Sequence, residues 1–400
     1  MKKLLFIAIT TSLFFSCKKE GNYSEKSASS LSELMAEKGQ NPDEAGVSDN
    51  TKAGVFDNTS AKKNRAGYVY TESNDAGTNR IIIYKQQSNG SLALQGSVAS
   101  GGAGTGALFG SQGAVVIDKK HDWLYAVNAG SNSVSSFKVG DDGGLTLAHT
   151  AASGGVRPVS VTVDKNFLYV ANQGNAIING YKIGNDGSLT VIPSTNLSLS
   201  SAAADPGEIS FHPNGNQLYI TERGTDKITS FQVNGQGVAY SRRVSAAAGV
   251  TPFGFDFARN YMVVANAHMD LPNLGGVSSY SLSNSGSVSA VNGNVPNNQT
   301  AACWTATTKH GRFAFIANSF SDDISSYYIG HDGTAYLING SAAPTDKRPR
   351  DISIIDNRYL YVLNVTDHTI GAYYRGPLGT LHAIGHVTNI PVWAAGLASY

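Results

Sequence analysis

The most regular feature of the chain is a short apolar phrase that recurs seven times. Each copy begins with an aromatic or aliphatic residue, usually continues with Tyr and a β-branched residue, and ends in Asn or Glu. The copies are Tyr68–Glu72, Leu124–Asn128, Leu168–Asn172, Leu218–Glu222, Met262–Asn266, Ala314–Asn318 and Leu360–Asn364. Their last residues are 56, 44, 50, 44, 52 and 46 positions apart. A repeat of roughly this length indicates one supersecondary unit per copy.

Further strand-like stretches flank each phrase. Downstream lies a segment with apolar residues at every second position, as in Lys227–Val233, which is typical of a half-buried strand. A hairpin signal such as Asn185–Gly187 and a short outer strand such as Ser188–Val191 follow. Upstream lies an apolar segment that often opens with Pro, as in Pro158–Val163. Four strands per repeat predict an all-β, seven-bladed β-propeller with the upstream segments innermost.

The two ends of the repeat region are incomplete in complementary ways. Pro391–Leu397 is an upstream segment with no phrase after it, whereas the phrase Tyr68–Glu72 has no clear upstream segment. We therefore expect the C-terminal segment to supply the inner strand of the first blade. That pairing would close the ring and leave only short, protected strand edges. The predicted propeller spans 67–400.

The N-terminus resembles a bacterial lipoprotein signal. Lys2 and Lys3 precede an apolar run, Leu4–Phe15, that is too short to cross a bilayer, and Ser16 and Cys17 follow it. The resemblance implies a signal segment at 1–17 with lipidation of Cys17, while a plain secretory signal with an incidental Cys is the alternative. Residues 18–66 are rich in Ser, Asn and charged residues, which predicts a flexible tether. We expect an exported protein anchored at the outer membrane or cell surface, or else a periplasmic one.

Composition narrows the class of partner. The net charge is +1, and no dense stripe of Lys and Arg occurs, which argues against nucleic-acid binding. Cys303 is the only cysteine besides Cys17, so no intrachain disulfide is possible once Cys17 is lipidated. No haem, phosphate-loop or nucleophile-elbow motif is present, and we predict no cofactor. The Asn and Glu that end the phrases could ring a Ca²⁺ ion, but a residue repeated in every blade more often serves its own turn, so we predict no metal.

The repeat resembles that of a known family. The Leu-Tyr-Val-Ala-Asn phrases, the Asp-Gly turns and His212–Gly215 are similar to those of the seven-bladed lactonase family, which includes 6-phosphogluconolactonases and carboxymuconate lactonising enzymes, and to surface-layer Tyr-Val-Thr-Asn repeats. For the lactonising members the resemblance implies a channel-mouth site of Arg, His and Glu. Here Val159 follows Pro158 where that family has His, and Gly207 and Glu208 follow Pro206 where it has Arg and His. Arg223 takes the place of the expected Glu, one position after Glu222.

Candidate site residues are those expected at the face where inner strands begin and phrases end. The catalytic candidates are Glu208 as general base and Arg223 or Arg350 as oxyanion stabiliser. The ligand-binding candidates are Arg157, Glu222, His268, Trp304, Asp351 and Trp393. Three interpretations stay open: Glu208 pairs with Arg350 or Arg157 or with backbone N–H groups; an Arg clamps a carboxylate or phosphate over a Trp; or the set hydrolyses a lactone.

These observations favour a binding or scaffold protein of the cell envelope, with a lactone hydrolase as the alternative. The expected partner is a small molecule, glycan or protein at the mouth face, in addition to the membrane reached by the lipid anchor. Loops on that face vary most in length and sequence, which is where a rigid scaffold usually carries its contacts.

Overall fold

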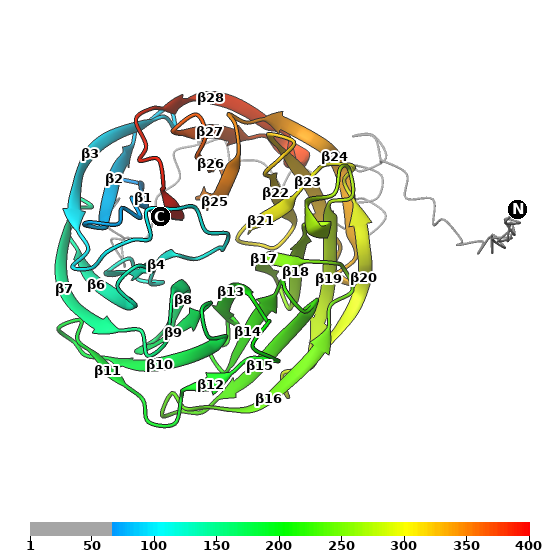
Figure 1. Ribbon diagram of the computed structural model, residues 1–400. Helices are drawn as coiled ribbons and strands as arrows, with labels where there is room; N and C mark the ends of the chain where they lie inside the picture. Colours follow the sequence, from blue (N-terminus) through cyan, green and yellow to red (C-terminus); the bar gives the residue numbers. More distant parts are fainter. Residues whose placement is uncertain (1–65) are drawn as a thin grey trace, which may run out of the picture.

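The computed structural model describes residues 66–400, and in this range seven antiparallel sheets surround a central axis (Figure 1). The predicted seven-bladed propeller is confirmed. The predicted signal segment at 1–17 and nearly all of the predicted tether at 18–66 lie outside the described residues. None of the helical segments at 66–400 is long and apolar enough to cross a membrane.

In each blade the first strand lies at the channel and the last strand lies at the outer rim. Blades 1 to 3 are β29 (Ala395–Ser399), β1 (Tyr68–Glu72), β2 (Arg80–Gln86) and β3 (Leu92–Ala99); β4 (Val115–Ile117), β5 (Trp123–Asn128), β6 (Ser133–Val139) and β7 (Leu145–Ala152); and β8 (Pro158–Asp164), β9 (Phe167–Asn172), β10 (Ile177–Ile183), β11 (Leu189–Val191) and β12 (Leu197–Ser198). Blades 4 and 5 are β13 (Pro206–Phe211), β14 (Gln217–Glu222), β15 (Lys227–Val233) and β16 (Ala239–Ala246); and β17 (Pro252–Ala258), β18 (Tyr261–Asn266), β19 (Gly276–Leu282) and β20 (Val288–Pro296). Blades 6 and 7 are β21 (Ala302–Thr307), β22 (Phe313–Asn318), β23 (Asp323–Ile329) and β24 (Ala335–Pro344); and β25 (Pro349–Ile355), β26 (Tyr359–Asn364), β27 (Thr369–Arg375) and β28 (Leu381–Val387). Within the described part of the chain, two short 3₁₀ turns lie in loops: η2 (His268–Asp270) and η3 (Pro377–Gly379).

The ring closes as expected, with one shift in the closing strand. β29 pairs with β1, and Ser399 lies opposite Val69. The strand begins at Ala395 rather than at the predicted Pro391, because the chain turns at Pro391–Ala394 through a hydrogen bond from the Ala394 N–H to the Pro391 carbonyl. The N- and C-terminal ends of the propeller therefore share one blade.

The recurring phrases form the second strand of every blade. All five residues of each phrase are buried, because this strand is covered by neighbouring blades on both of its faces. Burial on both faces explains why the first three residues of every phrase are apolar or aromatic and do not alternate with polar residues.

Turn glycines lock neighbouring blades together, a contact that the sequence analysis missed. Gly237, in the β15–β16 turn, has a φ of +80°, and a Cβ there would lie 2.3 Å from the Phe167 ring of the preceding blade. Gly143 lies in the same way against Tyr68, and Tyr70 donates a hydrogen bond to the Gly143 carbonyl at 2.9 Å. The Asp-Gly turns thus recur because each must fit an aromatic ring next door as well as turn the chain.

Candidate functional site

A loop from blade 2 crosses the channel at the end where the inner strands begin, which we call the mouth. We call residues 109–113 of this loop the crossing segment. Its Gln112 side chain forms two hydrogen bonds with the backbone of Thr305 in β21: Nε2 donates to the carbonyl at 2.7 Å, and Oε1 accepts the N–H at 2.9 Å. Trp304 Nε1 donates to the Ser111 carbonyl at 2.9 Å, and the Gln112 N–H donates to the Gly207 carbonyl at 2.9 Å. Figure 1 shows the segment in cyan, reaching across the ring to β21. It links blades 2, 4 and 6 across the axis.

Two arginines lie beside the crossing segment, each over an aromatic ring. Arg223 follows β14; its Nη2 forms an ion pair with Asp205 Oδ1 at 2.8 Å, and its guanidinium lies 4.7 Å from the Phe253 ring centre. The Arg350 guanidinium lies 5.8 Å from the Trp304 ring centre, and its Nε is buried with no hydrogen-bond partner among the described residues. The pKa of Arg350 is lowered by burial and by the neighbouring arginines, but it stays charged at pH 7. Arg350 is thus a cation with unused donors.

The η2 loop contains Asp270, whose carboxyl group lies near these arginines. His268, Met269 and Asp270 have φ values of 49°, 54° and 58°, so three consecutive residues with side chains adopt the left-handed conformation. This costs roughly 1–2 kcal/mol per residue and is the kind of backbone strain that clusters at functional sites. Burial raises the pKa of Asp270, while Arg350, Arg223 and Arg348 act to lower it. The loop therefore places one carboxyl group within the field of three arginines.

His268 supplies a second titratable group in the same loop. Burial lowers its pKa, against the opposing effects of Asn294 and Asp226, so the imidazole is neutral near pH 7. Its Nε2 is buried with no partner among residues 66–400. A neutral imidazole can accept a proton, which makes His268 chemically competent as a base.

The channel below the crossing segment holds a different set of charges. A cavity of about 300 Å³ is lined by Glu208, Asp256 and Asp351, but by neither Arg223 nor Arg350. Glu208 Oε2 accepts the Phe255 N–H at 2.7 Å. Burial raises the pKa of Glu208 well above its usual range, and the nearby Asp256 and Asp351 raise it further. Burial and the two neighbouring acids thus disfavour the charged form of Glu208 unless a cation lies beside it.

The three catalytic candidates therefore lie in two separate groups. Arg223 and Arg350 meet at the mouth, while Glu208 faces the channel and forms no ion pair with either of them or with Arg157. Of the open alternatives for Glu208, the structure shows the hydrogen bond from a backbone N–H.

The predicted ligand-binding residues are similarly divided. His268 lies at the mouth, whereas Asp351 lines the channel cavity. Trp304 is only 1% exposed and anchors the crossing segment, so it offers a ligand no surface. Glu222 is fully buried and accepts hydrogen bonds from Ser200, Thr225 and Thr229, which is a structural role.

The other two predicted residues lie on loops that lead into inner strands. Arg157 precedes β8, where its N–H donates to Asn132 Oδ1 at 2.7 Å. Trp393 is 36% exposed in the turn before β29. Neither one contacts the two arginines through a hydrogen bond or an ion pair.

Sequence reasoning left Arg348, Asp256 and Gln112 out of the site. The sequence did contain a signal for Arg348, because it directly precedes Pro349, the Pro that opens an inner strand. The structure shows that residues just before inner strands share a left-handed conformation, namely Arg157, Asp205, Thr251, Ala301 and Arg348. That shared conformation directs these positions to the mouth. Gln112 gave no signal, because the crossing segment lies in an insertion without a counterpart in other repeats.

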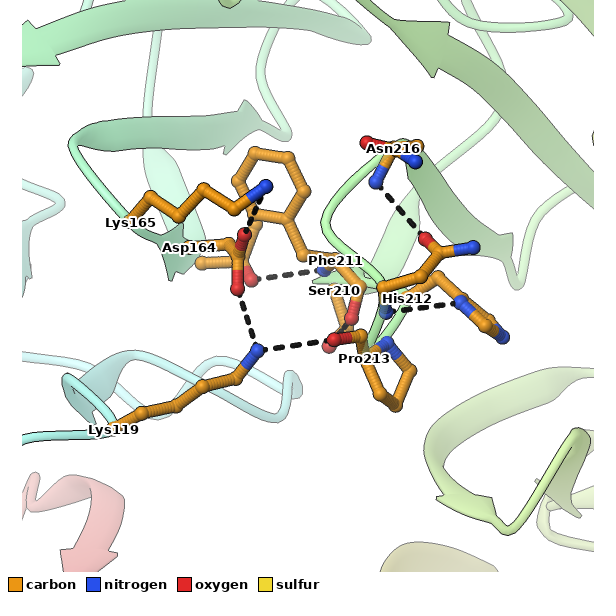
Figure 2. Close-up of polar contacts among 10 residues, drawn as sticks. Lys119, Asp164, Lys165, Ser210, Phe211, His212, Pro213 and Asn216 are labelled. Atoms are coloured by element: carbon orange, nitrogen blue, oxygen red, sulfur yellow. Dashed lines mark hydrogen bonds and ion pairs between the residues drawn. The ribbon is translucent and has the colours of Figure 1, made fainter. Parts of the chain in front are cut away.

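A larger cavity, of about 600 Å³, lies between blades 2 and 3 on the face away from the mouth. Figure 2 shows Lys119 and Lys165 converging on Asp164. Lys119 Nζ lies 2.5 Å from Asp164 Oδ1 and 3.2 Å from the Pro213 carbonyl oxygen, and Lys165 Nζ lies 4.0 Å from Asp164 Oδ2. The whole lining of this cavity holds three lysines, at 119, 120 and 165, and three aspartates, at 118, 122 and 164, so it has no excess charge. The cavity, although larger, is therefore a weaker candidate than the mouth.

Comparison with known proteins agrees with the architecture. The family model described as "Lactonase, 7-bladed beta-propeller" matches residues 109–195 and 190–274. No curated protein matches the chain at a significant level.

Solved structures extend the similarity over the whole propeller. A Bacteroides fragilis protein provisionally named a 6-phosphogluconolactonase is 17% identical, covers 85% of this chain and 99% of its own, and superposes with a TM-score of 0.67. A Bacteroides uniformis protein with the same provisional name is 17% identical over 82% of this chain and 98% of its own, with a TM-score of 0.66. The Pseudomonas aeruginosa periplasmic gluconolactonase is 16% identical over 84% of this chain and 98% of its own, with a TM-score of 0.66. At these identities the superpositions show a shared fold. The chain is therefore a seven-bladed β-propeller, and its residues 109–274 are similar to the lactonase family of such propellers.

Proposed function

We propose that this protein binds a small anionic ligand, of the sugar-acid class, at the mouth of the propeller. The observation that carries the proposal is Arg350, a charged guanidinium that lies over Trp304 and has a buried Nε without a partner among the described residues. Arginine is suited to bidentate recognition of carboxylate and phosphate groups. Arg223, which is fixed by Asp205, provides a second cation beside it.

The ligand class follows from charge. Three arginines, Arg223, Arg348 and Arg350, act on the Asp270 carboxyl group. Arg223 is neutralised by its ion pair with Asp205, so two arginines face the single Asp270 charge and the mouth has an excess of positive charge. An anion would relieve the repulsion between Arg350 and its neighbours. Relatives named as gluconolactonases make a sugar acid, the hydrolysed form of such a lactone, the first compound to test.

A lactone hydrolase is the second candidate, and the η2 loop favours it. In this mechanism His268 or Asp270 takes a proton from water as the water oxygen attacks the lactone carbonyl carbon, and Arg350 stabilises the oxyanion. The ring C–O bond then breaks, and the leaving oxygen receives the proton, which gives a hydroxy acid. Glu208 takes no part, because it faces the channel below.

We also propose that the protein acts at the cell envelope, attached through a lipid on Cys17. The support is the charged start, the short apolar run and the Ser16–Cys17 junction. The location is compatible with a sugar acid outside the cytoplasm. In a bacterial host, Cys17→Ser should release the protein from the membrane fraction and abolish labelling by a fatty-acid analogue, whereas equal labelling of both proteins would overturn the anchor.

Calorimetric titration with gluconate and 6-phosphogluconate, together with an assay of gluconolactone hydrolysis, tests both candidates. Loss of the charge-assisted bonds in Arg350→Gln should weaken binding roughly tenfold or more. Arg243→Gln, at a solvent-facing arginine of outer strand β16, is the matched control and should bind like the wild type. Binding without turnover supports the first candidate, and turnover lost in Arg350→Gln and His268→Gln supports the second. If Arg350→Gln binds as tightly as wild type, the mouth is not the site.

A further inference from the structure

The channel cavity contains three acids and no base. Glu208 from β13, Asp256 from β17 and Asp351 from β25 line it, and among the described residues no Lys or Arg does. Glu208 and Asp351 are both buried, and the charges of Asp256 and Asp351 reach Glu208. Buried carboxylates without a counter-charge are costly, so they either hold protons or face a cation.

The hydrogen bonds show which of these acids is available to a ligand. Asp256 is satisfied, because Oδ1 accepts the Phe257 N–H at 2.7 Å and Oδ2 accepts both the N–H and the hydroxyl of Thr307 at 2.8 Å. Asp351 uses only Oδ1, which accepts the Ile352 N–H at 2.8 Å. Its Oδ2 forms no hydrogen bond with residues 66–400, and the Leu397 N–H is only near enough to lower the pKa of the carboxyl group. The side chain is 2% exposed and lines the cavity.

A buried oxygen without a hydrogen-bond partner is uncommon in folded proteins, which favours a role for Asp351 Oδ2 as a hydrogen-bond acceptor for a ligand. Glu208 adds further capacity, because only its Oε2 is engaged, with the Phe255 N–H. The two side chains occupy equivalent places, each being the third residue of its inner strand. A hydrogen-bond donor in the cavity would therefore meet two acceptors from different blades.

The walls and the size of the cavity define the donor further. Beyond the acids, aliphatic side chains such as Val115, Ile117, Ile354 and Leu397 line the cavity. No group of three or more His, Cys, Asp and Glu side chains within 66–400 is arranged to hold a metal ion. A cation with several N–H donors and a short apolar chain suits this lining better than a bare ion. We propose that the channel cavity binds a small protonated aliphatic amine, with its ammonium group between Asp351 and Glu208.

The amine site is separate from the proposed anion site at the mouth. The crossing segment lies between them, and the cavity extends away from it to Ser399 and Ile354 at the far ends of the inner strands. A ligand would therefore enter from the face opposite the mouth. The amine proposal stands whether or not the mouth binds a sugar acid.

Calorimetric titration of the whole protein with n-propylammonium chloride at pH 9, above the Asp351 pKa of about 8, tests the proposal. Saturable heat is expected with this probe and not with n-propanol, which has a similar size and shape but no charge, or with sodium chloride at equal ionic strength. Asp351→Asn and Glu208→Gln should each weaken binding roughly thirtyfold or more, the change expected when one member of a buried charge pair is removed. Asp122→Asn, at a partly exposed acid that does not line the channel cavity, is the matched control and should bind normally.

Asp351→Asn places an uncharged side chain of the same shape in the cavity, so it keeps the test valid if Glu208→Gln fails to fold. Melting curves establish that each variant is folded. The proposal is overturned if propylammonium gives no saturable heat, if n-propanol binds equally well, or if folded Asp351→Asn binds like the wild type. Saturable binding of Ca²⁺ in place of the amine, lost in the same variant, would also overturn it and make the cavity a metal site.

Discussion

Replacing Asp351 with Asn should make the protein more stable at alkaline pH and leave it nearly unchanged at acidic pH. Asp351 is 2% exposed, and burial raises its pKa to about 8, against the opposing effects of the Ile352 and Leu397 N–H groups. In the unfolded chain the same carboxyl has an ordinary pKa near 4. Between these two values the folded state holds a proton that the unfolded state has lost.

The direction of the pH dependence of stability follows from the number of protons that each state binds. Because the folded state binds more protons, stability falls as the pH rises from about 4 to about 8, and it is fully retained below the unfolded pKa. At 1.36 kcal/mol per pH unit the difference amounts to roughly 5 kcal/mol as an upper limit. Buried sites behave as if their dielectric constant were higher than that of dry protein, so we expect roughly 2 kcal/mol. The Asn side chain carries no charge at any pH and escapes this penalty.

Urea unfolding followed by circular dichroism at pH 5 and pH 9 measures the effect. Asp351→Asn should match the wild type within about 1 kcal/mol at pH 5 and exceed it by roughly 2 kcal/mol at pH 9. Asp122→Asn, at a partly exposed site, should show no pH-dependent difference. An equal change in the free energy of unfolding at both pH values would refute the burial argument, because it would show that the Asp351 charge has no cost in the fold.

Three further predictions concern the ring itself. Gly237→Ala should lower the free energy of unfolding by more than about 2 kcal/mol, because the added Cβ would clash with Phe167 and φ is positive at this residue. Gly235→Ala should be tolerated, because a Cβ there would have no atom within 4 Å. Equal urea midpoints for the two variants would contradict the interblade fit. Trp304→Phe removes the hydrogen bond to the Ser111 carbonyl and should cost roughly 1–3 kcal/mol while increasing hydrogen exchange at the Gln112 N–H, and unchanged exchange would show that Trp304 does not anchor the crossing segment. Deletion of 391–400 removes β29 and should open blade 1, so a truncated protein that melts like the intact one would refute ring closure by this strand.

The repeat signal allowed the architecture to be predicted, because each blade buries its second strand on both faces and therefore repeats the same local pattern. Ring closure was also predictable, since a blade without an inner strand and an inner strand without a blade can only complete each other. The exact start of β29 was not, because Pro391–Ala394 is apolar enough to read as strand and forms a turn instead.

The candidate site depended on geometry that alternation along a strand does not reveal. The pairing of β25 with β26 shifts register between Pro349 and Asp351, and that of β13 with β14 shifts between Pro206 and Glu208. A bulge at this point changes the direction of the side chains that follow. Arg350 therefore lies at the mouth over Trp304, while the adjacent Asp351 lines the channel cavity.

The crossing segment was decided by tertiary structure alone. Its hydrogen bonds join Gln112 to Thr305, 193 positions away, and no repeat unit contains both residues. The sequence by itself determined seven blades and their order, since those depend on contacts within or between adjacent repeats. The division of the axis into a cationic mouth and an acidic channel depends on contacts across the ring, which exist only once all seven blades have closed.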